Sequence, residues 1–180
     1  MGDKKVTFAE VDQLSRKLAQ KVASCQPDCV ISIEEGGCPI GTVVARELNL
    51  PHYSIRVEKW YYKFPNWFKH LVRSIENNAP WPLNKIFYNS ANLATRGLNR
   101  VIKPRVKTGF NGPVSLKAKI LLVDDDIGSG ATIKSALSYL RQKGFENIKT
   151  AAIRGDKGFT VDYSAAPTTP ILSFPWPWRN

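Results

Sequence analysis

Ile120-Leu-Leu-Val-Asp-Asp-Asp-Ile-Gly-Ser-Gly-Ala-Thr132 is the stretch of this 180-residue chain that decides its fold. The run Lys119–Val123 is continuously apolar after its first residue, as expected of a parallel strand that is buried on both faces. After the loop, apolar residues recur at helical spacing from Ile133 to Leu140, and Gly144 ends the pattern. The stretch therefore predicts a strand, a loop and a helix in succession.

The chain on either side of this stretch alternates predicted strands and helices. Thr7 and Glu10 fit a capping box at the start of a first helix, and a further helical pattern runs through Val43 to Leu48. Other strands are expected at residues 29–33, 52–57 and 148–153. This order predicts an α/β fold with a mainly parallel central sheet flanked by helices.

Composition indicates one soluble domain. A hydrophobic fraction of 43% over 180 residues suffices for one core and is too little for two ordinary domains. No apolar run approaches the roughly 18 residues of a membrane span, and the amino-terminal residues lack the pattern of a secretory signal. Cys25, Cys29 and Cys38 do not have the paired spacing of a zinc site. We therefore expect a cytoplasmic protein with reduced thiols and no membrane partner.

The net charge of +11 is concentrated in one segment. Between Lys59 and Lys107 the chain has ten basic residues, a single acidic residue, Glu76, and 9 of its 19 aromatic residues. The rest of the chain is nearly neutral. The segment is expected to interrupt a single domain, 1–180, as an insertion at about residues 58–117.

The predicted insertion interleaves aromatic and basic side chains, as single-stranded nucleic-acid binders do. The candidate nucleic-acid contacts are Lys59, Trp60, Lys63, Trp67, Lys69 and Arg73. A lid over a ligand site would have the same composition, and so would the interface of a homo-oligomer or of a larger complex. These readings stay open, with the lid or interface slightly favoured.

The loop after the apolar strand has the chemistry of a phosphate cradle. Ligands of open parallel sheets gather at the carboxyl ends of the strands, where this loop would lie. Gly128 and Gly130 allow a tight turn, Ser129 and Thr132 supply hydroxyls, and the helix that follows offers N–H groups to an anion. The three carboxylates at residues 124–126 can accept hydrogen bonds from vicinal hydroxyls or hold a divalent cation. Ribose 5-phosphate supplies both partners, although three aspartates could also simply cap a helix.

Residues 120 to 132 resemble the phosphoribosyl pyrophosphate (PRPP) signature of type I phosphoribosyltransferases. The resemblance implies that Asp124 and Asp125 bind the ribose hydroxyls and act in catalysis, with Mg²⁺ as the expected cofactor and these two acids as its candidate ligands. The phosphate-binding residues that it implies are Asp126, Ile127, Gly128, Ser129, Gly130, Ala131 and Thr132.

A second segment, Ile33-Glu-Glu-Gly-Gly-Cys-Pro-Ile-Gly41, is similar to the pyrophosphate loop of xanthine-guanine phosphoribosyltransferases, the subgroup with the nearest likeness. The likeness implies a pyrophosphate loop of Glu34, Glu35, Gly36 and Gly37. The family usually places a basic or neutral residue before the two glycines. Two carboxylates there would repel pyrophosphate unless a metal ion intervened or their pKa values rose. Glu35 is nevertheless a candidate catalytic residue.

Val161-Asp-Tyr163 and Phe174-Pro-Trp176 resemble the carboxyl-terminal hood of the same subgroup, at about residues 160–180. The alignment implies that Arg154, Ile171 and Leu172 lie at the base. Ile171 stands where an aromatic residue usually stacks, and Gly128 stands where 6-oxopurine enzymes carry an Asp. Both departures argue against guanine, hypoxanthine or xanthine more than against transfer itself.

Three functions follow as expectations. The first is a pentosyltransferase that moves a ribose 5-phosphate moiety between PRPP, or a nucleotide, and a nucleobase-like molecule. The second is a divergent effector or regulatory module that binds nucleotide or nucleic acid within a larger complex, for example in defence. The third is hydrolysis of a nucleotide's N-glycosidic bond, with Glu34 or Glu35 as the base.

Overall fold

The computed structural model describes residues 4–58, 105–110, 112–128, 130–155, 159–166 and 172–176. The chain divides into two compact units, Met1–Val57 with Val106–Asn180, and Glu58–Arg105. The elements that position the candidate site belong to the first unit. The predicted nucleic-acid contacts Lys59, Trp60, Lys63, Trp67, Lys69 and Arg73, together with Ser129 and Ile171, lie outside the described residues.

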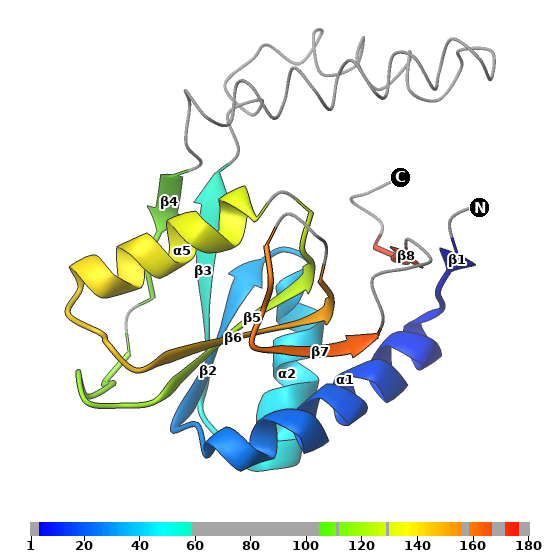
Figure 1. The fold of residues 1–180 in the computed structure, drawn as a ribbon, viewed down its shortest axis with the longest axis horizontal. Helices are drawn as coiled ribbons and strands as arrows, with labels where there is room; N and C mark the ends of the chain where they lie inside the picture. Colours follow the sequence, from blue (N-terminus) through cyan, green and yellow to red (C-terminus); the bar gives the residue numbers. More distant parts are fainter. Residues whose placement is uncertain are drawn as a thin grey trace, which may run out of the picture. The chain divides into compact units, whose positions relative to one another are not determined.

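The central sheet of the described chain has the strand order β4-β3-β2-β5-β6-β7 (Figure 1). Its strands are β2 Cys29–Glu34, β3 His52–Glu58, β4 Arg105–Thr108, β5 Ile120–Asp126, β6 Ile148–Arg154 and β7 Tyr163–Ala166. β2 pairs in parallel with β3 and β5, and β6 pairs in parallel with β5 and β7. The predicted α/β fold with a mainly parallel sheet is therefore confirmed, and the carboxyl ends of β2 and β5 meet at one edge.

Three α-helices of the described chain cover the two faces of this sheet (Figure 1). They are α1 Phe8–Val22, which continues into the short helix η1 Ala23–Cys25, α2 Gly37–Leu48 and α5 Ala131–Gln142. The predicted capping box is present, because Thr7 Oγ1 accepts the Glu10 N–H while Glu10 Oε2 accepts the Thr7 N–H. None of the helices in the described ranges has the length and apolarity that crossing a bilayer requires.

The core consists of two clusters, one on each face of the sheet. Leu121 and Val123 of β5 pack in the cluster with α1 and α2, whereas Ile120 and Leu122 pack in the cluster with α5. Side chains of a strand alternate between its faces, so Asp125 continues the first series. Asp124 and Asp126 continue the second series. The three consecutive aspartates are thereby divided between the two faces.

A small second sheet joins the two ends of the described chain. β1 Lys4–Lys5 pairs in parallel with β8 Leu172–Ser173. The residues after β8 enter the core beside α1, where Phe174 and Trp176 are buried. Leu172 also packs in this cluster.

The boundary that differs most from the sequence expectation is the end of β5. The strand predicted to end at Val123 continues to Asp126, so the three aspartates are strand residues rather than loop residues. The reason is pairing with β6, because Asp124 lies opposite Ala152 and Asp126 lies opposite Arg154 in the ladder. Backbone hydrogen bonds to a neighbouring strand outweigh the weak strand propensity of aspartate.

Candidate active site

The candidate active site lies where the predicted pyrophosphate loop meets the end of β5. A Cβ atom on Gly36 would overlap Asp125 Oδ2, and one on Gly37 would lie 2.7 Å from the Val123 carbonyl oxygen. Only glycine lets the backbone approach a neighbouring strand this closely. The structure thus brings together two of the predicted segments, the Glu34–Gly37 loop and the acids of β5.

Asp125 is a buried carboxylate with two identified hydrogen-bond donors. Its side chain is 2% exposed. Oδ2 accepts the indole Nε1–H of Trp176 at 2.8 Å, and Oδ1 accepts the backbone N–H of Asp126 at 2.7 Å. A buried charge is costly unless such donors surround it. The Asp125 carboxylate is therefore held from inside the protein.

Asp124 differs from Asp125 in the face it occupies. It lies on the α5 side of β5 and is 8% exposed, and its Oδ1 accepts the backbone N–H of Asp125 at 2.9 Å. The two predicted ribose-binding acids are consequently not equivalent. Asp125 contacts Trp176 and Gly36, whereas Asp124 faces the side on which the following helix begins.

Asp126 forms an ion pair with Arg154. Arg154 Nη2 lies 2.8 Å from Asp126 Oδ1 and 3.0 Å from Oδ2, and the guanidinium is almost fully buried. The backbone N–H of Ile127 donates to the Arg154 carbonyl oxygen at 3.0 Å, and the Ile127 side chain lies in the core. The structure therefore joins a predicted base-binding residue to a predicted phosphate-binding residue.

The turn between β5 and α5 ends on Gly130. This glycine has a φ of +74°, and a Cβ there would overlap Phe159. Ala131 and Thr132 follow in the first turn of α5, whose N-cap residue is Gly130. Such a helix start, with its positive dipole end, attracts anions. Gly128 differs, since a Cβ there would have no atom of the described residues within 4 Å.

The two glutamates of the predicted pyrophosphate loop share one cation, Arg56 of β3. Arg56 Nε lies 3.0 Å from Glu34 Oε2, and Arg56 Nη2 lies 3.2 Å from Glu35 Oε1. Ser54 Oγ donates to Glu34 Oε1 at 2.7 Å. The side chains of Glu35 and Arg56 are 45% and 46% exposed. One positive charge therefore offsets part of the repulsion that the sequence predicts at this loop.

The pKa of the Cys38 thiol, in the first turn of α2, is affected by the charges around the loop. Burial raises the pKa of the Cys38 thiol to about 11, with further contributions from the negative charges of Glu34, Asp124 and Glu35. These charges lie at the carboxyl ends of both β2 and β5. The thiol stays protonated at neutral pH, and the surroundings of the loop are net negative.

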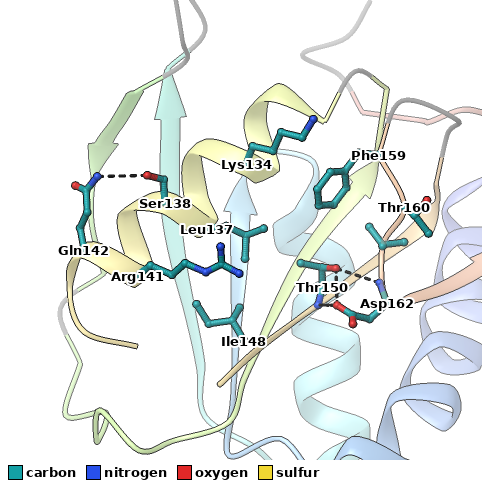
Figure 2. A pocket seen from close by; sticks show the side chains of 11 residues that line it. Lys134, Leu137, Ser138, Arg141, Gln142, Ile148, Thr150, Phe159, Thr160 and Asp162 are labelled. Atoms are coloured by element: carbon teal, nitrogen blue, oxygen red, sulfur yellow. Dashed lines mark hydrogen bonds between the residues drawn. The ribbon is translucent and has the colours of Figure 1, made fainter. Parts of the chain in front are cut away.

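A separate pocket of about 870 Å³ lies between α5 and β6 (Figure 2). The residues that line it are Lys134, Leu137, Ser138, Arg141, Gln142, Ile148, Thr150, Phe159, Thr160, Val161 and Asp162. The Lys134 ammonium lies 5.4 Å from the centre of the Phe159 ring. None of the predicted site residues that the structure describes lines this pocket, so the pocket is distinct from the edge formed by β2 and β5.

Asp162, at the rim of this pocket, is held by β6. Burial raises the pKa of its carboxyl, but hydrogen bonds from the Thr150 amide, the Lys149 ammonium and the Thr150 hydroxyl outweigh burial and hold the pKa below its usual value. The Thr150 N–H and Oγ1 each lie 2.8 Å from Asp162 Oδ2. These contacts fix the start of β7 against β6.

Comparison with known proteins identifies the family. Residues 3–165 match the phosphoribosyl transferase domain. The chain belongs to this family. It is accordingly a phosphoribosyltransferase-like protein of the pentosyltransferase type, as the signature at the end of β5 predicted. No curated protein matches the sequence of this phosphoribosyltransferase domain.

Solved structures share the fold of this phosphoribosyltransferase domain at low identity. The purine phosphoribosyltransferase of Pyrococcus horikoshii Ot3 is 19% identical with a TM-score of 0.69, covering 98% of this chain and 94% of that chain. The Helicobacter pylori xanthine-guanine-hypoxanthine phosphoribosyltransferase is 14% identical with a TM-score of 0.66, covering 96% and 92%. A Neisseria gonorrhoeae hypothetical protein solved with bound ppGpp is 16% identical with a TM-score of 0.61, covering 98% and 91%.

Two residues at the site were missed by the sequence prediction. Arg56 stands opposite Glu34 in the parallel pairing of β2 and β3, so charge matching between these strand ends was the available signal. Trp176 was predicted only as part of the hood, and nothing local links it to Asp125. Leu172, predicted at the base, packs in the core cluster beside α1.

Proposed function

We propose that the chain binds PRPP at the edge formed by β2 and β5 and transfers its phosphoribosyl group to a nucleobase. In this reaction the bond from ribose C1 to pyrophosphate breaks as the bond from C1 to a base nitrogen forms. The observation that carries the proposal is the contact of Gly36 with Asp125, which joins a pyrophosphate loop to a ribose-binding acid. Membership of the family supports it.

The proposed roles follow the two faces of β5. Asp124 accepts hydrogen bonds from the ribose hydroxyls, and Asp125 supports it from the buried side. The 5-phosphate binds the turn from Gly128 to Gly130 and the first turn of α5, where Thr132 offers a hydroxyl. Backbone N–H groups and the helix dipole then stabilise the phosphate.

Pyrophosphate binds the loop of Gly36 and Gly37, beside Glu35 and its cation partner Arg56 of β3. The described residues contain no group of three or more His, Cys, Asp or Glu that would cage a metal ion. Mg²⁺ fits such a site, because it prefers carboxylate oxygens and keeps most of its other contacts with water and substrate phosphates. Asp124 and Glu35 are the carboxylates that would hold it, and Mg²⁺ bound there would supply positive charge to offset that of pyrophosphate.

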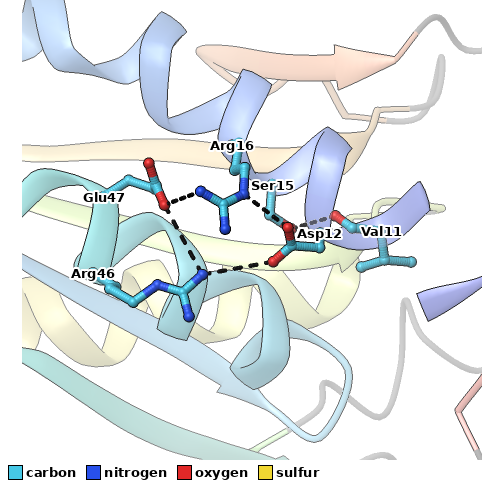
Figure 3. Close-up of polar contacts among 6 residues, drawn as sticks. All are labelled: Val11, Asp12, Ser15, Arg16, Arg46 and Glu47. Carbon is cyan, nitrogen blue, oxygen red and sulfur yellow. Dashed lines mark hydrogen bonds and ion pairs between the residues drawn. The ribbon is translucent and has the colours of Figure 1, made fainter. Parts of the chain in front are cut away.

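Purified protein incubated with PRPP, Mg²⁺ and a panel of nucleobases tests the proposal. We expect release of pyrophosphate with at least one base, and loss of that release in Asp124→Asn. The control is Asp12→Asn, which changes the same functional group in a surface cluster. In this cluster Asp12 and Glu47 each form ion pairs with Arg16 and Arg46 (Figure 3). Absence of PRPP binding by the unaltered protein would contradict the proposal.

A second candidate is a module that binds a nucleotide without transferring its ribose. The glutamates of the loop favour this candidate, because their negative charges repel the pyrophosphate group of PRPP. The fold is also shared with a protein solved with bound ppGpp. Calorimetric titration with nucleoside mono-, di- and tetraphosphates, without PRPP, tests this candidate. Tight binding with no turnover supports the module, and release of a free base supports hydrolysis with Glu35 as the base.

A further inference from the structure

Trp176 is fixed more firmly than a residue that only covers a ligand needs to be. Its side chain is 1% exposed. The indole stacks on Phe174, with ring centroids 5.7 Å apart and planes 11° apart, and Phe8 of α1 packs at an angle with its ring centroid 5.9 Å away. Pairing of β8 with β1 anchors the segment that carries Trp176. The position of its N–H is therefore set by the fold.

The acceptor of this N–H is a carboxylate of the candidate site. A buried tryptophan commonly donates to an available acceptor, and a charged acceptor makes the bond shorter and stronger. Here the acceptor is Asp125, at 2.8 Å and 51 positions away in the sequence. The bond links the carboxyl-terminal segment to the end of β5.

Asp125 passes this constraint to two neighbours. Its carboxylate lies against the Cα of Gly36, so its orientation limits where the loop after β2 can lie. Its backbone N–H donates to Asp124 Oδ1 at 2.9 Å. A chain of contacts therefore runs from Trp176 through Asp125 to the loop and to Asp124.

We propose that Trp176 is a positioning residue for phosphoribosyl transfer, acting through Asp125. This inference rests on the proposed function and adds a residue that contacts neither PRPP nor the base. The indole N–H holds the Asp125 carboxylate in one orientation. That orientation keeps Gly36 and Asp124 in the geometry that binds PRPP.

Trp176→Phe tests the inference, because it removes the N–H and keeps an aromatic ring. We expect kcat/KM for PRPP to fall about tenfold or more, since the lost bond is to a charged group. In the Asp125→Ala background, which has no side-chain acceptor for the indole N–H, the same change should cost less than about threefold, because residues that act through one another are not additive. The control is Val22→Ala, which removes buried apolar atoms from the same core cluster and should lower the urea midpoint without changing kcat or KM.

The outcomes separate the two proposals. An unaltered protein that does not bind PRPP overturns the proposed function and this inference with it. If the unaltered protein turns PRPP over and Trp176→Phe lowers only the urea midpoint, Trp176 is merely structural and the inference alone is wrong. Equal losses from Trp176→Phe in both backgrounds would also overturn it, since Asp125 would not carry the effect.

Discussion

The ends of β2 and β5 are both acidic, but their charges are held in different ways. At β5, Asp125 is buried against Trp176 and Asp126 is paired with the buried Arg154. At β2, Glu34 and Glu35 share Arg56, which is nearly half exposed. Buried, hydrogen-bonded charges keep a fixed geometry, whereas exposed ion pairs are weak and screened by salt. The β5 end is therefore preorganised, whereas the ion pairs at the β2 end are weaker and sensitive to ionic strength.

We expect Gly36→Ala to have the largest effect, because it disrupts the contact between the ends of β2 and β5. The added methyl group overlaps the Asp125 carboxylate, so the loop or the acid must move. We expect a loss of about 1–3 kcal/mol in the free energy of unfolding. Turnover of PRPP should fall more than about hundredfold, as expected when reacting groups are displaced.

Urea unfolding and steady-state kinetics measure both effects, with Gly128→Ala as the matched control for stability. A Cβ at Gly128 would contact none of the residues that the structure describes, so the free energy of unfolding should change by less than about 0.5 kcal/mol. Equal stability losses at the two glycines would contradict the close approach of the loop to β5.

Asp124→Asn isolates the β5 end. The amide keeps an oxygen that can accept the Asp125 N–H, so the free energy of unfolding should change by less than about 1 kcal/mol. Loss of the charge should reduce kcat/KM for PRPP about hundredfold, as for other preorganised polar groups. A large loss of stability with normal kinetics would reverse the roles that we propose for Asp124 and Asp125.

Arg56→Gln isolates the β2 end, with a smaller expected effect. The KM for PRPP should rise about tenfold at low salt, because the two glutamates are left without their cation. The difference from the unaltered protein should shrink as salt is added. Arg46→Gln is the control, since Arg46 is an exposed cation of α2 that pairs with Asp12 and Glu47. A KM that is independent of Arg56 at every salt concentration would exclude it from the site.

The smallest effect concerns Cys38, which senses both strand ends. With a pKa of about 11, its thiol should be alkylated slowly at pH 8 and faster as the pH approaches that value. Glu34→Gln should lower this pKa more than Asp124→Asn does, because Glu34 makes the larger charge contribution. Peptide-resolved mass spectrometry after alkylation at several pH values measures the difference. Identical profiles for the two variants would show that Cys38 does not distinguish the two ends.

The sequence predicted strands β2, β3, β5 and β6, the three helices and the two segments that meet at the site, because these depend on local patterns. It did not predict β4, β7 or the pairing of β1 with β8. Continuous apolar runs identified β2 and β5, and the capping box at Thr7 identified α1. The length of β5 was underestimated, because pairing with β6 draws Asp124–Asp126 into the strand.

Long-range contacts were harder to predict for a physical reason. The bond between Trp176 and Asp125 depends on where the end of the chain packs, and no pattern near either residue indicates it. Arg56 was within reach of prediction, since parallel pairing of β2 with β3 places it opposite Glu34. Arg154 was assigned to the base from the resemblance alone, and its ion pair with Asp126 needs the register of β5 and β6.

Three identical residues in a row at Asp124–Asp126 look interchangeable, but the pleat of β5 places their side chains in two groups on opposite faces of the sheet. A variant library aimed at ligand preference would combine positions 124, 126 and 154. Asp124 and Asp126 lie on the same face of β5, and Asp126 forms an ion pair with Arg154. Position 125 belongs with 36 and 176, and any exchange there has to be compensated within that second group. Randomising the whole acidic triplet at once would mix the two groups, and most members would fail for reasons unrelated to substrate choice.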